Sequence, residues 1–170
     1  MDSRVLELER LYRERYVAFR NGVATLTGSY DSARDVVQEA FAQALRDIDQ
    51  YRGDGPLAAW VWRIAVRVAF TSRRNGRELT LEEVAERAPA PPALESDPAL
   101  SAALRALPAR RRLIVYLRYF ADLSYAQIAA VCGISEGTVA ASLSQARAEL
   151  HRTLEAEPKE GAVRWMRRTN

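Results

Sequence analysis

The sequence predicts an all-α protein made of two small helical domains joined by an acidic, proline-containing linker. Apolar residues recur at helical spacing in several segments, and no alternation with a period of two persists anywhere. A cluster of prolines then interrupts the helical pattern, since helix cannot continue through Pro89, Pro91, Pro92 and Pro98. The predicted parts are a first domain at 1–75, a linker at 76–98, a second domain at 99–156 and a basic C-terminal tail at 157–170.

Composition narrows the class of protein. The 170 residues are 48% hydrophobic and 28% charged, a mixture typical of a helix-rich globular protein with a core. Of the 25 basic residues only Lys159 is lysine, and arginine suits phosphate and guanine. Because Cys132 and His151 are single residues of their kinds, a disulfide within the chain and a zinc site are excluded. Without a signal segment or a long apolar run, we expect a cytoplasmic protein with no membrane insertion.

Two helices are predicted in the first domain. The earlier one begins near Asp31 or Ser32, either of which can cap it, and carries an apolar stripe of Val36, Val37, Ala40, Phe41, Ala44, Leu45 and Ile48. The later one follows the break at 53–56 and has one face of Leu57, Trp60, Val61, Ile64, Ala65 and Val68. A second strip on it, Trp62, Val66 and Phe70, has two interpretations, core packing or contact with unstacked bases.

The clearest local signal in the second domain is a helix-turn-helix over 125–150. Ala129 is small where two helices cross, Gly133 permits a tight turn, and Ser135 is a good N-cap for the second helix. The alternative is an ordinary helical hairpin. If the motif binds DNA, residues near the start of its second helix face the major groove, namely Glu136, Thr138, Ala140, Ala141, Ser144 and Gln145.

Phosphate contacts could come from Arg147 or from the arginine run at 110–112, although a solvated helix face explains that run equally well. An enzyme is not expected, because no nucleophile, base and orienting group recur together and no glycine-rich phosphate loop is present. No cofactor or metal is expected either.

The order of five segments resembles the extracytoplasmic-function (group 4) sigma factors of bacterial RNA polymerase. The segments are 35–41 (DVVQEAF), 59–65 (AWVWRIA), 107–112 (LPARRR), 123–129 (LSYAQIA) and 133–139 (GISEGTV). The resemblance extends from Leu8 to Leu154. It implies a sigma region 2 in the first domain and a region 4 in the second, joined by a short linker in place of a larger middle domain.

The resemblance also implies partners and residues. Core RNA polymerase would be bound at its clamp coiled coil and its flap, the clamp through Asp35, Gln38, Glu39 and Gln43. Promoter DNA, melted at the minus-ten element, would meet Arg63, Arg67, Phe70, Thr71, Arg73 and Arg74. Upstream DNA would meet the helix-turn-helix through Arg112, Ser135, Glu136, Thr138, Ala141, Ser144, Gln145 and Arg147. An anti-sigma factor is a further possible partner.

Departures from the family pattern fall on DNA contacts. Arg67 and Thr71 stand where the family usually has Asn and Asp, and Ala140, Ala141, Ser142 and Gln145 replace a more basic run. Losing cations weakens the neutralisation of DNA phosphates.

The predicted function is a transcription initiation factor that directs core polymerase to promoters and aids melting. Two alternatives stay open: a sigma-like regulator with reduced promoter recognition, and a free-standing helix-turn-helix regulator.

Overall fold

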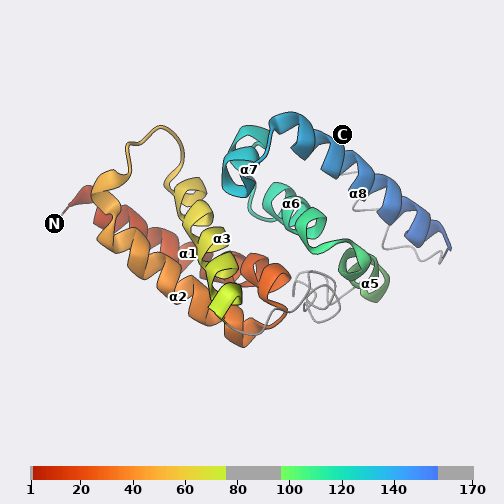
Figure 1. Ribbon diagram of the computed structural model, residues 1–170, viewed down its shortest axis with the longest axis horizontal. Coiled ribbons are helices and arrows are strands. Elements are labelled where there is room, and N and C mark those ends of the chain that lie inside the picture. The colour runs from red at the N-terminus through yellow and green to blue at the C-terminus, as the bar shows by residue number, and fades with distance from the viewer. Residues whose placement is uncertain (1, 76–96, 157–170) are drawn as a thin grey trace.

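The computed structural model describes residues 2–75 and 97–156, with the side chains of 72–75 left out, and these residues form helices and no strand. The all-α prediction is therefore confirmed. Figure 1 shows two groups of helices side by side, α1 to α3 in one and α5 to α8 in the other. The elements are α1 (Ser3–Thr27), α2 (Tyr30–Arg46), a short 3-10 turn η1 (Ile48–Gln50), α3 (Leu57–Asn75), α5 (Pro98–Ala106), α6 (Ala109–Tyr119), α7 (Tyr125–Cys132) and α8 (Glu136–Ala156).

A tight turn joins α1 to α2. Gly28 ends α1 with a φ of 77°, a left-handed conformation that glycine adopts at little cost. Ser29 then caps α2, its hydroxyl accepting a hydrogen bond from the backbone N–H of Ser32 at 3.1 Å. The prediction of Asp31 or Ser32 as the cap is wrong by two or three residues, because both lie inside the first turn of α2.

The predicted stripe of α2 forms the core of the first group, with one exception. Val36, Val37 and the other predicted stripe residues are buried, but the side chain of Leu45 is 51% exposed. On α3, the residues of the second predicted apolar strip, Trp62, Val66 and Phe70, differ in burial. Trp62 and Val66 are buried, and the Trp62 ring stacks on Phe19 of α1 with centroids 4.2 Å apart, whereas Phe70 is 46% exposed. Core packing is thus the correct interpretation for the first two residues only.

The second group begins with a capped helix. The Asp97 carboxylate accepts from the backbone N–H of Leu100 at 3.0 Å, and Pro98 occupies the first helical position, where its fixed φ fits. Pro98, which the sequence prediction placed in the linker, is thus the first residue of α5. The linker residues 76–96, and the predicted tail at 157–170, lie outside the described residues.

The helix-turn-helix has the predicted local geometry. Ser124 and Gln127 form a reciprocal capping box at the start of α7. Gly133 ends α7 with a φ of 65°, and Ser135 accepts from the backbone N–H of Thr138 at 3.1 Å to begin α8. Val139 is fully buried and anchors the second helix.

The two groups pack against each other through α1, α3, α6 and α7 and share one buried apolar cluster. The Tyr116 hydroxyl on α6 donates a 2.9 Å hydrogen bond to the Ala18 carbonyl on α1. Gly22 makes this approach possible, since a β-carbon there would lie 2.4 Å from the Trp62 ring and 2.8 Å from the Tyr116 ring. The absence of a side chain at one position therefore sets the distance between α1, α3 and α6.

Candidate nucleic-acid and polymerase interface

The side of α2 opposite its core stripe is polar and exposed. Asp35 and Glu39 have side-chain exposures of 73% and 56%, and Gln38 is exposed beside them. Arg46 pairs with Glu39 at 2.8 Å, and Arg34 lies 3.8 Å from Asp35, so each carboxylate has only a solvent-exposed cation nearby. Such surface pairs contribute little to stability and exchange readily for another basic partner. Gln43 is half-buried at the end of the same face.

An apolar groove of about 440 Å³ runs between α1 and α2 next to this polar face. Gln38 belongs to both surfaces. The other lining residues are Val5, Leu8, Glu9, Tyr12, Phe41, Ala42 and Leu45. Leu45, which the periodicity assigned to the core, instead lines this groove with half of its surface exposed.

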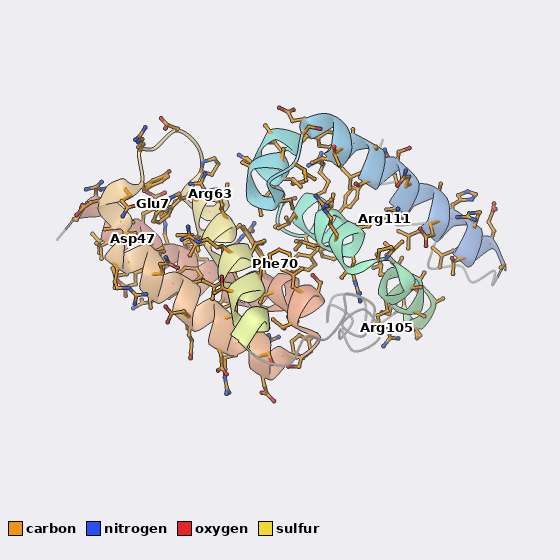
Figure 2. The ribbon with its side chains drawn as sticks, in the orientation of Figure 1. Glu7, Asp47, Arg63, Phe70, Arg105 and Arg111 are labelled. Carbon is orange, nitrogen blue, oxygen red and sulfur yellow. The ribbon has the colours of Figure 1, made fainter. Side chains whose placement is uncertain are left out.

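The outer side of α3 presents cations and one aromatic ring. Arg63, Arg67 and Phe70 are exposed, and Arg63 and Phe70 are labelled along α3 in Figure 2. Thr71 is also exposed, but its hydroxyl donates to the Arg67 carbonyl at 3.0 Å. The side chains of Arg73 and Arg74 lie outside the described residues, so their predicted role stays a prediction.

A hollow of about 590 Å³ lies where the segment before α3 meets α7. Tyr51 and Trp60 line it as a tilted aromatic pair with centroids 5.6 Å apart, and Arg52 and Arg63 add charge. Gln127 on α7 forms part of the opposite wall. Our sequence prediction missed this hollow, since only the fold brings α7 next to Trp60, although aromatic and arginine residues around 51–63 could have indicated a base-binding site.

The beginning of α8 is exposed along the predicted recognition side. The exposed residues include all those predicted on α8 and its cap, namely Ser135, Glu136, Thr138, Ala141, Ser144, Gln145 and Arg147. Ala140 is half-buried. One carboxylate, hydroxyl groups and methyl groups therefore make up the exposed first two turns, an amide follows at Gln145, and a cation first appears at Arg147.

Arg111 connects α6 to this recognition side. Its Nη1 donates to Glu149 Oε2 at 2.6 Å, and its Nη2 donates to Gln145 Oε1 at 2.9 Å. The pair is partly shielded from solvent, with side-chain exposures of 25% for Arg111 and 32% for Glu149. One guanidinium thus holds two side chains of α8 that lie one helical turn apart.

Arg112 requires a correction. The sequence predicted a DNA contact there, but the residue is only 4% exposed and lies among Thr25, Leu104 and Val115. Burial, and to a smaller extent the nearby charge of Arg105, lowers the pKa of Arg112 to about 10. Because its neighbour Arg111 faces α8, the helical rotation turns Arg112 inward, and it does not present its charge to a DNA backbone in this structure.

Other chemistry is scarce among the described residues. They include no cluster of three His, Cys, Asp or Glu side chains that could hold a metal ion. Cys132 is half-buried, and burial raises the pKa of its thiol to about 11. In the described part of the chain no single helix suffices to cross a membrane; α7 and α8 meet the length and composition test only as a pair bent by 102°.

These surfaces define a helical protein with an exposed polar face on α2, an exposed side of α3 that carries arginines and one aromatic ring, and a helix-turn-helix. Comparison with family models matches Sigma-70 region 2 to residues 11–78 and Sigma-70 region 4 to residues 98–150. The ECF RNA polymerase sigma-E factor of Escherichia coli K12 is 35% identical over 152 residues, covering 77% of this chain and 80% of that protein. The chain therefore belongs to the extracytoplasmic-function sigma factors, the family that its motif order indicated.

Further relatives agree with this assignment. The RNA polymerase sigma factor YlaC of Bacillus subtilis 168 is 26% identical over 167 residues, covering 92% of this chain and 96% of that protein. Among solved structures, CnrH in complex with the cytosolic domain of CnrY has a TM-score of 0.63 at 25% identity, covering 88% of each chain. Sigma factor RpoE of Bartonella quintana, in complex with the anti-sigma factor NepR, has a TM-score of 0.66 at 23% identity, covering 88% of this chain and 99% of that one.

This chain is thus a transcription initiation factor that acts with core RNA polymerase and promoter DNA, as predicted. The match over region 2 rules out the alternative of a free-standing helix-turn-helix regulator, since that alternative leaves residues 11–78 without a role.

Proposed function

We propose that this sigma factor docks on core polymerase through the polar face of α2, reads melted DNA along α3 and reads upstream duplex DNA along α8. The observation that carries the proposal is the exposure of all three surfaces on one chain with both sigma regions. The chain would supply binding and positioning, while polymerase performs the chemistry. It would act in the bacterial cytoplasm, where polymerase and chromosome meet.

For docking, the support is chemical complementarity. Asp35, Gln38 and Glu39 offer acceptors to a basic surface, and the adjacent groove between α1 and α2 can receive apolar side chains. Gln43, half-buried at the end of this face, would contribute an amide. The clamp coiled coil is the proposed partner of this face, and the flap that of region 4.

For melting, the support is the hollow beside α3. A base that leaves the duplex gains from stacking on an aromatic ring, by about 1–3 kcal/mol. Tyr51 and Trp60 offer rings in that hollow, Arg63 lies at its edge to meet phosphate, and Phe70 is exposed further along α3. We propose that an unstacked minus-ten base stacks on these rings once α7, which forms the other wall of the hollow, has moved away.

Binding both promoter elements requires the two helical groups to separate. The minus-ten and minus-thirty-five elements are about 25 base pairs apart, and at 3.4 Å per pair this is about 85 Å along the duplex. In the structure α3 and α7 are in direct contact. We propose that core polymerase binds the opened form.

Measurement of the affinity for core polymerase tests docking. Asp35→Asn with Glu39→Gln removes both charges without changing side-chain size and should weaken binding to core polymerase at least about tenfold. Glu155→Gln is the matched control, because this carboxylate is similarly exposed on α8 and, within residues 2–75 and 97–156, pairs with His151 of the same helix. Unchanged core affinity in the double variant would show that the α2 face is not the docking site.

A second candidate function is a sigma-like regulator that binds polymerase but reads promoters weakly. It is favoured by the exposed start of α8, where Ala141 stands in place of a base-reading donor. Genome-wide mapping of DNA bound together with polymerase separates the candidates. A shared pair of spaced motifs supports promoter-directed initiation, and normal core binding without any shared motif supports the regulator.

A further inference from the structure

Arg111 and Gln145 are brought together by the packing of α6 on α8. Gln145 lies on the exposed recognition side of α8, and Ala141, one turn earlier, is a small residue. Helical side chains lean toward the N-terminus, and the small Ala141 leaves room on that side of the Gln145 amide. A carboxamide in this position can contact a base edge in the major groove, provided that α8 is the reading helix proposed above.

The contact with Arg111 determines which way this amide points. A guanidinium carries donors and no acceptor, so the Gln145 atom that it contacts at 2.9 Å must be the carbonyl oxygen. Glu149 holds the same guanidinium from the next turn at 2.6 Å and keeps it from turning away. The oxygen of the amide therefore faces α6, and its NH2 group is left for an external partner.

A glutamine held in this way differs from a free one. A free glutamine reads adenine with both ends of its amide, accepting from N6 and donating to N7. With the oxygen turned toward Arg111, only donation remains. Guanine presents two acceptors in the major groove, O6 and N7, adenine and thymine present one each, and cytosine presents only a donor.

We propose that Arg111 is a positioning residue that makes Gln145 a donor-only reader, so that this sigma factor selects guanine over the other three bases at one position of its upstream element. Arg111 is then not a phosphate contact, and that role falls to cations that remain exposed, such as Arg110 and Arg147. The inference rests on the proposed function of α8.

The test uses holoenzyme made from core polymerase and the full chain, selected on promoters with a randomised upstream element. Gln145→Ala first identifies the position at which preference disappears. At that position the wild type should favour guanine over adenine by at least about fivefold. Arg111→Met should reduce that ratio to one or below, since the released amide can then bind adenine with both ends.

Two further variants control for folding and for charge. Gln145→Glu keeps the contact with Arg111 but replaces the outward donor with an acceptor, so the preference should move to cytosine. It alters only an exposed side chain, so it keeps the inference testable if Arg111→Met fails to fold. Arg110→Met removes an exposed cation from the same helix and should lower affinity for all sequences equally without changing base preference.

The outcomes separate this inference from the proposed function. Absence of any upstream motif with the wild type would overturn DNA reading by α8 and the inference with it. A motif that Gln145→Ala leaves unchanged, a wild-type preference for adenine, or a guanine preference that survives in Arg111→Met would overturn the inference while upstream reading stands.

Discussion

Replacing Gly22 with alanine tests how closely the two helical groups approach. The added β-carbon would lie 2.4 Å from a Trp62 ring atom and 2.8 and 2.9 Å from two atoms of the Tyr116 ring. Both rings are buried, so they cannot turn aside as the end of a flexible side chain would. Forcing extra volume into a packed core costs about 1–3 kcal/mol, and three short contacts indicate the upper end of that range.

A gain in helix propensity opposes this packing cost. Alanine is a better helix former than glycine by about 1 kcal/mol. The expected net result is a loss of about 2 kcal/mol in the free energy of unfolding, obtained from those two principles. For a chain of this size that loss lowers Tm by about 4–8 °C.

Gly137→Ala is the matched control. Gly137 lies in the first turn of α8, and a β-carbon there would meet only the Ser135 hydroxyl oxygen at 3.8 Å, an ordinary contact. Only the helix-propensity gain remains, so this variant should be stabilised by up to about 1 kcal/mol. Thermal and urea unfolding measure both variants. If Gly22→Ala is stabilised as much as Gly137→Ala, the reasoning about the approach of α1, α3 and α6 is wrong.

Three other predictions follow from single contacts. Tyr116→Phe should lose about 1 kcal/mol in urea unfolding, because it removes the hydrogen bond to the Ala18 carbonyl, and no loss would show that this bond contributes nothing. Ser124→Ala should cost about 1 kcal/mol by removing the capping box with Gln127, checked by the Tm; an unchanged Tm would contradict the role of the cap. Cys132, with a pKa of about 11, is protonated at pH 7, so alkylation should be much slower than for a free thiol and should accelerate as pH rises toward 11. Rapid alkylation at pH 7 in the folded protein would refute that raised pKa.

The helices of this protein could be predicted from the sequence because short-range rules decide them. The apolar spacing of α2, the glycine at position 133 and the cap at Ser135 act within a few residues, and each is found as predicted apart from Leu45 in the stripe of α2. The rules for N-caps were less exact at α2, because several residues near its start can act as caps. Ser29 caps this helix in place of Asp31 or Ser32. The order of motifs along the chain was enough to indicate the family.

Burial of individual side chains depended on neighbours from other elements. Leu45 fits the stripe of α2 by spacing, but half of its side chain remains exposed beside the groove with α1. Arg112 belongs to a run of three arginines that spacing alone cannot distinguish, yet Arg112 turns inward while Arg111 contacts α8. Arg111 and Arg112 are neighbours in the chain, so they point in directions about 100° apart around α6. The packing of α6 against other helices decides which of the two is buried.

The sequence by itself determined the all-α class, the helix-turn-helix and the sigma family, since these depend on residue types and on short or ordered spacings. Tertiary structure decided the contact of Tyr116 with Ala18, the hollow between Trp60 and α7, and the hold of Arg111 on Gln145. The partners in these contacts are separated by tens of residues in the chain, and a periodic pattern of residue types does not predict which distant residues come into contact. The orientation of the Gln145 amide on α8 therefore comes from α6 as much as from the sequence of α8 itself.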